Sequence, residues 1–126
     1  MREIKFRLIN TKSSERIDPK EFFIANSEVF IYYSDFDNSE KADMSHHVIL
    51  QYTGLKDKNG VEIYEGDIIE NDSDDSHEVV TFDEGSFWLE GSTYTTPLYE
   101  VNTGAEEVIG NIYENPELLE RDSDEL

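Results

Sequence analysis

The chain has 126 residues, no cysteine and a formal net charge of −20 at pH 7. This length is typical of one domain with a modest core, and the lack of cysteine excludes disulfides, thiolate catalysis and cysteine-bound zinc. A charge this negative repels nucleic-acid phosphates and anionic lipid headgroups, so direct binding to either is not expected outside the first twenty residues.

The charge is distributed unevenly along the chain. Residues 1–20 carry a net charge of +3, residues 21–58 carry −4, and residues 59–126 carry −19. The expected partners are therefore basic proteins, cations or other copies of the same chain. The first residues lack the apolar stretch of a signal peptide, and no apolar run approaches the roughly 18 residues of a membrane span. We therefore expect a soluble protein of the cytoplasm.

The first predicted strand lies at the start of the chain, where Ile4, Phe6 and Leu8 alternate with Lys5 and Arg7. An alternation of period two places one set of side chains on the core and the other set in water. It therefore predicts that Lys5 and Arg7 share an outward face.

Other elements are predicted before residue 53. β-Branched and aromatic residues favour strands at 28–33 and 48–52. One helical turn is expected at 19–24, and the polar run at 34–41 indicates an exposed loop.

The central segment 51–68, QYTGLKDKNGVEIYEGDI, places evenly spaced glycines between two tyrosines. A phosphate-binding loop needs a glycine-lysine pair followed by serine or threonine, which is missing here, and the acids of the segment repel a phosphate. Asn59-Gly60 instead favours the positive φ values of a tight hairpin turn that leads into a strand at 61–64. The residues predicted to form structural turns are Gly54, Asn59, Gly60, Gly66 and Asp67.

Short strands and sharp turns continue through the second half of the chain. The sequence at 83–86, Asp-Glu-Gly-Ser, is a hairpin signal between strands at 79–82 and 87–89. A proline and early acids predict a short helix at 115–120. The other expected elements are a strand at 68–69, an acidic loop at 70–78, a strand at 107–112 and a frayed tail at 121–126. This spacing predicts a mainly β (α+β) fold, either a small barrel or a strongly bent sheet.

No catalytic or metal-binding constellation stands out in the sequence. Asp72, Asp74, Ser76 and Asp83 have part of a calcium-loop spacing, but His77 occupies the position where that loop needs glycine. The adjacent histidines His46 and His47 point to opposite faces of a strand and do not converge on one metal. All three histidines are expected at the surface. Pairs of carboxylates arise by chance among thirty acids. The prediction is a protein that is not an enzyme, with no catalytic residue, cofactor or metal site.

Two regions are candidates for contact with a partner. Strand alternation places Phe87 and Leu89 in the core and Trp88 with Glu90 on the opposite face. A partly exposed tryptophan beside acids either anchors a basic partner through burial and cation–π attraction or packs against a neighbouring loop. The basic first strand is expected to meet acidic surface, within the chain or on a neighbouring copy. The candidate interaction residues are Lys5, Arg7, Glu62, Glu65, Asp67, Asp72, Asp74, Asp75 and Trp88.

Three segments, MREIKFR, QYTGLKDKNGVEIYEGDII and VIGNIYENPELLE, occur in this order along the chain. Together they resemble the YopX-like proteins of bacteriophages and prophages. The resemblance implies a single domain, 1–126, with an N-terminal β segment at 1–50 and an SH3-like β-barrel and short helix at 51–120. It also implies a bacterial host cell. It transfers no catalytic residue, because the family carries no established enzymatic activity.

Three functions are compatible with the sequence. The first is a non-enzymatic phage or prophage accessory protein that acts through protein–protein contacts, as a homo-oligomer or with a basic host protein. The second is an acidic DNA mimic that inhibits a host nucleic-acid-binding protein, because residues 59–126 carry a charge of −19. The third is a small hydrolase built on carboxylates. Direct nucleic-acid binding and membrane binding are not expected.

Overall fold

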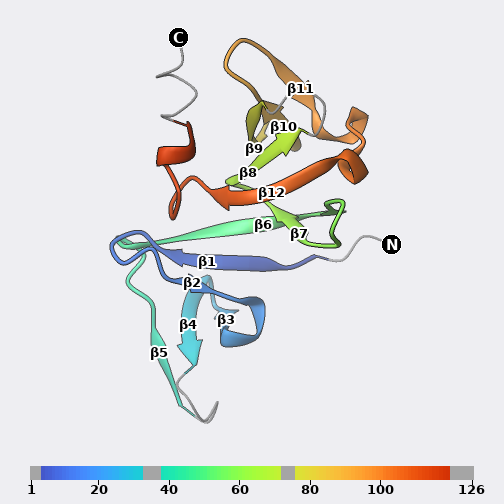
Figure 1. The fold of residues 1–126 in the computed structure, drawn as a ribbon. Helices are drawn as coiled ribbons and strands as arrows, with labels where there is room; N and C mark the ends of the chain where they lie inside the picture. The colour runs from blue at the N-terminus through green and yellow to red at the C-terminus, as the bar shows by residue number, and fades with distance from the viewer. Residues whose placement is uncertain (1–3, 33–37, 72–75, 120–126) are drawn as a thin grey trace. The chain divides into compact units, whose positions relative to one another are not determined.

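Most of the described secondary structure is β-strand, which confirms the predicted mainly β class (Figure 1). By their contacts, the residues divide into an N-terminal unit, Ile4–Gln51, and a C-terminal unit that starts at Tyr52. The single-domain organisation stays a prediction. The residues that this computed structural model describes are 4–32, 38–71 and 76–119. Predictions that concern residues 1–3, 33–37, 72–75 and 120–126 lie outside the described residues.

The described part of the N-terminal unit contains short antiparallel strands and the first half of a longer one. They are β1 (Phe6–Asn10), β2 (Arg16–Ile17), β3 (Phe22–Ala25), β4 (Glu28–Tyr32), β5 (Ser39–Lys41) and β6 (His47–Lys56), with a 3-10 turn at Pro19–Glu21. Strand β1 lies between β2 and β6, and β4 lies between β3 and β5 in a separate sheet. The strands predicted at 28–33 and 48–52 are therefore confirmed, with small changes at their ends.

The core of the N-terminal unit joins side chains from both of its sheets. Its buried members are Leu8, Ile17, Phe22, Val29 and Ala42. Leu8 on β1 lies opposite Ile17 on one neighbouring strand and Ile49 on the other, so the three side chains form one row across the sheet. Burial of this apolar surface stabilises the unit by about 25 cal/mol for each Å² removed from water.

The first strand differs from its prediction. Ile4 is 69% exposed and lies before β1, and Lys5 is half-buried. Arg7, Leu8 and Ile9 are all buried, although Arg7 and Ile9 point to one face of the strand and Leu8 to the other. The prediction that Lys5 and Arg7 share an outward face is therefore wrong for Arg7, which is 8% exposed. Alternation of apolar and charged residues indicates which face of a strand is buried. It does not show whether other parts of the protein also bury the charged face.

Two segments predicted as helix or loop contain strands. The helical turn expected at 19–24 ends at Glu21, and the next residues form β3. Positive φ angles at Asn26 and Ser27 make the tight turn that joins β3 to β4. The exposed loop predicted at 34–41 ends in β5, an edge strand whose three side chains are exposed. Because β5 contains no apolar residue, no hydrophobic pattern reveals it.

The C-terminal unit is built around a five-stranded antiparallel sheet. Its described elements are β7 (Glu62–Tyr64), β8 (Asp67–Asn71), β9 (His77–Asp83), β10 (Ser86–Glu90), β11 (Thr95–Pro97) and β12 (Glu106–Asn111), with 3-10 turns at Leu98–Glu100 and Thr103–Ala105. The strands follow the order β11, β10, β9, β8, β12, and the sheet curls into a half-barrel (Figure 1). The sequence did not predict β11, which is short and ends in proline.

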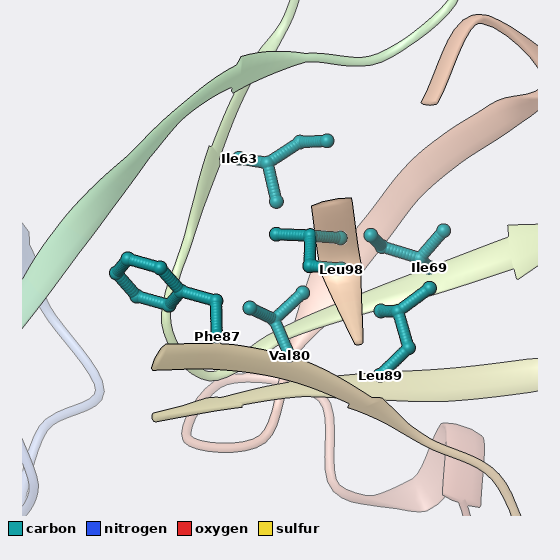
Figure 2. Packing of buried hydrophobic residues seen from close by; sticks show 6 residues of the cluster. All are labelled: Ile63, Ile69, Val80, Phe87, Leu89 and Leu98. Atoms are coloured by element: carbon teal, nitrogen blue, oxygen red, sulfur yellow. The ribbon is translucent and has the colours of Figure 1, made fainter. Parts of the chain in front are cut away.

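Figure 2 shows one cluster of buried side chains in this unit, formed by Ile63, Ile69, Val80, Phe87, Leu89 and Leu98. Val80 on β9 lies directly opposite Leu89 on β10, and Phe82 lies opposite Phe87. The rings of Phe82 and Phe87 meet edge to face, with their centroids 4.9 Å apart. The predicted inward face of β10 is therefore confirmed, because Phe87 and Leu89 both belong to the core.

Glycines in a left-handed backbone conformation bend the chain around the central hairpin. The φ angles of Gly54, Gly60 and Gly66 are 89°, 80° and 88°. Glycine adopts such values without the steric cost of a Cβ, as a turn or corner requires. The turn is longer than the tight form expected from Asn59-Gly60: residues 57–61 separate the paired ends of β6 and β7, and Asn59 lacks the positive φ of a two-residue turn.

The last described segment begins the predicted C-terminal helix. The backbone N–H of Leu118 donates to the carbonyl of Asn115, and that of Leu119 donates to the carbonyl of Pro116, both at 3.1 Å. The side-chain oxygen of Asn115, the residue before Pro116, accepts from the N–H of Asn111 at the end of β12. No helix among the described residues is long and apolar enough to cross a membrane.

Candidate functional site

Asp57 lies in the turn after β6 and organises the central hairpin. Its Oδ1 accepts hydrogen bonds from the backbone N–H groups of Asn59 at 2.8 Å and Val61 at 2.9 Å. Its Oδ2 accepts from the N–H of Val108 on β12, at 2.9 Å. The first two bonds hold the turn, and the third ties the turn to a strand far along the sequence.

The carboxylate of Asp57 is a buried charge that the fold itself satisfies. Burial opposes ionisation, but the three backbone hydrogen bonds and the nearby charge of Lys58 outweigh it and hold the pKa of Asp57 below its usual value. Because this charge is directed at N–H groups of the same chain, we assign Asp57 to the fold and not to a binding surface.

Asp67 is a second acid that the fold uses. Its Oδ2 accepts from the backbone N–H of Tyr64 at 2.8 Å, and the residue is only 1% exposed. This burial removes Asp67 from the predicted contact face. A short carboxylate that bonds to its own turn has the same sequence pattern as a solvated one, so composition alone does not separate the two.

Of the other acids of the predicted contact face, Glu62 and Glu65 lie in the described part of the chain. Glu62 and Glu65 are half-buried. The hydroxyl of Tyr64 donates to Oε1 of Glu62 at 3.2 Å. Glu65 lies near Tyr113, whose pKa is raised first by burial and then by the charge of Glu65. The predicted contact residues outside the described part of the chain are Asp72, Asp74 and Asp75.

His77 is largely buried, which corrects its expected place at the surface. Its side chain is 10% exposed, and Nε2 lies 3.1 Å from a carboxylate oxygen of Glu70. Nδ1 lies 3.1 Å from the carbonyl oxygen of Leu118. Both ring nitrogens therefore face acceptors, one on β8 and one in the C-terminal helical turn. Leu118 lies 41 residues further along the chain, beyond the reach of any local pattern.

The other two histidines lie beside Asp43 in the N-terminal unit. His47 Nδ1 is 2.7 Å from the carbonyl oxygen of Asp43, and His46 Nε2 is 3.5 Å from its carboxylate. Hydrogen bonds from the side chain and backbone of Ser45 are the main cause that lowers the pKa of Asp43. Within the described ranges, no group of three or more histidine, aspartate or glutamate side chains is placed to hold a metal ion. The calcium-like spacing includes residues 72–75, which lie outside those ranges.

A cleft of about 430 Å³ lies on the outer face of β9, β10 and β11. In the cross-strand register, Trp88 stands between Thr81 and Pro97, and Glu90 lies opposite Thr95. The indole N–H of Trp88 donates to the backbone carbonyl of Asp83 at 3.1 Å, which fixes the ring. The residues that line the cleft are Thr81, Phe82, Asp83, Trp88, Glu90 and Thr95.

Strand alternation predicted part of this cleft. It placed Trp88 and Glu90 on the face opposite the core, and the structure confirms this, with Trp88 half-buried and Glu90 exposed. It did not bring Thr95 beside them, because β11 was not predicted. The glycine and serine at 91–92 mark a turn before Thr95, and this is the signal in the sequence that favours a returning strand.

The exposed surface of the C-terminal unit is acidic. Between residues 52 and 119, the sequence contains two lysines, Lys56 and Lys58, and no arginine. Lys58 lies 3.7 Å from a carboxylate oxygen of Glu107. The exposed acids in the described part of this range are Asp83, Glu84, Glu90, Glu100, Glu114 and Glu117. Two of these six line the cleft over Trp88.

Comparison with known proteins gives a family and two similar structures. A family model described as YopX protein matches residues 3–120. The crystal structure of protein EF1440 from Enterococcus faecalis aligns with a TM-score of 0.67 and 31% sequence identity, over 94% of this chain and 99% of EF1440. Protein yopX from Bacillus subtilis aligns with a TM-score of 0.62 and 25% identity, over 91% of this chain and 97% of yopX. No curated protein matches the chain. The resemblance predicted from three sequence segments is thus confirmed, and the chain belongs to the YopX family.

Proposed function

We propose that this protein acts by binding a basic protein partner through the acidic surface of its C-terminal unit, and that it catalyses no reaction. The observation that carries the proposal is the excess of exposed acids there: six described acids are exposed, against two lysines between residues 52 and 119. Complementary charge steers association and selects against acidic partners. Each exposed ion pair contributes only about 0 to 1 kcal/mol, so several must act together.

A partner other than a second copy of the chain fits this surface better. Self-association needs a basic face, and the predicted one depended on Lys5 and Arg7. Arg7 is buried, so it adds no exposed charge to such a face. A homo-oligomer is therefore the weaker form of the proposal.

The cellular setting and the barrel type belong to the same proposal. We place the protein in the cytoplasm of a bacterial host and in a phage or prophage, on the likeness of its three sequence segments to proteins of that origin. We describe the curled five-stranded sheet as SH3-like, because short antiparallel strands with glycine corners are typical of such barrels.

A nucleic-acid-binding partner is the second candidate form of this function. Residues 59–126 carry a charge of −19, and a protein with such a charge competes with DNA for a basic groove. Duplex DNA then displaces the protein from its partner. If a basic partner uses a surface other than a DNA-binding groove, DNA does not displace the protein from it. This difference separates the two forms.

The test is affinity capture with the full chain from bacterial lysate at low and at high salt, followed by binding measurements with the purified partner. The expected result is a basic protein that is retained at low salt, released at high salt and bound directly once purified. A variant with Glu84, Glu100, Glu114 and Glu117 changed to glutamine should bind it more weakly. Capture of only further copies of the chain, with a solution mass above 14.6 kDa, contradicts the basic-partner proposal and supports a homo-oligomer.

A further inference from the structure

We infer that the cleft over Trp88 is the docking place of an extended basic segment of the partner, with one positively charged side chain stacked on the indole ring. The inference rests on the proposed function and adds the place of contact and the spacing of the charges. It follows from three features of the cleft: a fixed aromatic ring, a carboxylate on each side of it, and a cross-strand geometry that matches an extended ligand.

Trp88 is held in position before any partner binds. Its indole N–H is bonded to the carbonyl of Asp83, and its cross-strand neighbours are Thr81 and Pro97. A ring that is already fixed loses little conformational freedom on binding, so more of the contact free energy appears as affinity. The ring is half-buried, which leaves part of its surface on the cleft.

The two acids of the cleft lie on either side of Trp88 along β10. Glu90 follows Trp88 by two residues on the same face of the strand. Asp83 lies opposite Ser86, which precedes Trp88 by two residues on that face. Both acids are exposed and line the cleft. Along a strand at about 3.3 Å per residue, their positions are roughly 13 Å apart.

This arrangement matches an extended segment with positive charges at alternate positions. In such a segment, residues i, i+2 and i+4 point to one side at steps of about 7 Å. The outer two then reach Asp83 and Glu90 while the middle one lies over Trp88. Arginine suits all three places, because its planar guanidinium stacks on an indole and binds a carboxylate through two N–H groups.

Other ligand classes fit the cleft less well. An anionic ligand is repelled by Asp83 and Glu90 and by the net charge of −20. A purely apolar ligand removes water from these carboxylates and from the threonine hydroxyls without replacing their hydrogen bonds. A basic segment satisfies the acids and covers the indole at the same time.

The chain contains a single tryptophan, so its intrinsic fluorescence reports directly on this cleft. We would titrate the full chain at low salt with two peptides of equal length, composition and charge. One peptide has three arginines alternating with serines, and the other has three adjacent arginines followed by two serines. We expect a saturable change in Trp88 fluorescence at one peptide per chain, with about 3- to 10-fold higher affinity for the alternating peptide.

Two double variants of equal net charge separate the cleft from the general acidity. Asp83→Asn with Glu90→Gln removes the acids of the cleft, whereas Glu84→Gln with Glu100→Gln removes two exposed acids that do not line it. The first pair should weaken binding of the alternating peptide about 3- to 10-fold more than the second. Trp88→Leu, followed with a fluorescein-labelled peptide, should weaken it as well, and thermal melts check that each variant is folded.

Equal affinity for the two peptides, or equal losses in the two double variants, overturns the inference. In that event the acidic surface attracts basic chains without a defined place, and the proposed function is unaffected. The proposed function fails separately if the captured partner binds equally well after neutralisation of the four acids outside the cleft and the two within it.

Discussion

Two regions of the C-terminal unit use carboxylates in different ways. In the central hairpin, Asp57 and Asp67 are buried and accept hydrogen bonds from backbone N–H groups of the chain. On the outer face of the sheet, Asp83 and Glu90 are exposed beside a half-buried tryptophan. The net charge of a chain therefore overstates the charge of its exposed surface, because some of the charged side chains are buried and bond to the backbone.

The largest expected effect comes from the acid that the fold uses most. Asp57→Ala leaves three backbone donors without their acceptor and should lower the free energy of unfolding by about 2 to 4 kcal/mol. The matched change Glu90→Ala, on the exposed face, should cost less than about 0.5 kcal/mol. Urea denaturation of both variants measures the difference. Similar losses in the two variants would show that the exposed acid stabilises the fold as much as the buried one does.

The next effect concerns the backbone of the same turn. Gly60 has a φ of +80°, and a Cβ added there meets no atom within 4 Å, so a substitution is opposed by backbone strain alone. Gly60→Val should cost about 1 to 3 kcal/mol, and Gly60→Asn clearly less, because asparagine tolerates this region better. Thermal melts rank the two variants. An unchanged melting temperature in Gly60→Val contradicts the observed turn.

The contribution of Asp57 should also depend on pH. The folded-state pKa of Asp57 is lowered, so its charge stabilises the fold above the unfolded-state pKa of about 3.9, and this stability is lost as pH falls through the lower folded value. The gap in unfolding free energy between wild type and Asp57→Asn should therefore be constant near neutral pH and shrink below about pH 4. Urea denaturation across this range tests it. A gap that grows on acidification reverses the sign and rejects the assignment.

A smaller effect is expected on the exposed side of the comparison. Asp83→Asn with Glu90→Gln should change the free energy of unfolding by no more than about 0.5 kcal/mol, because both side chains are exposed. The same double variant should lose affinity for a basic peptide. A large loss of stability would show that these acids serve the fold, as Asp57 does.

The smallest expected effect is that of divalent cations. Calcium, magnesium or zinc at moderate concentration should give no rise in melting temperature. A cation that binds a specific site of the folded state stabilises it by an amount that grows with the logarithm of the free cation concentration above the dissociation constant. Differential scanning fluorimetry with each cation measures this. A shift with fixed stoichiometry would identify a metal site and contradict the expectation.

Local patterns predicted what local chemistry decides. The turn before β10 follows from Glu84 and Gly85, which both have positive φ in a two-residue connection. The outward position of Trp88 follows from strand alternation. In both cases the determining residues are neighbours in the sequence, and the structure agrees with the prediction.

The predictions that were wrong or missing have a different cause. They depend on contacts between residues that are far apart in the sequence. The burial of Arg7 depends on what covers the second face of β1, and the burial of His77 depends on Leu118. Strand β11 depends on its pairing with β10, since proline at its end weakens the local signal. The candidate site was accordingly predicted at Trp88 and Glu90, and missed at Thr95 on β11.

We expect the three bonds on Asp57 to form at different points in the folding of this unit. Asn59 and Val61 lie two and four residues away from Asp57, so their bonds close as soon as the hairpin forms. The bond from Val108 spans 51 residues and waits until β12 reaches the sheet. Ordering a long loop delays such a contact in the folding reaction. A change at Asp57 therefore acts on an early and a late step together, and its effect is shared between the rates of folding and unfolding.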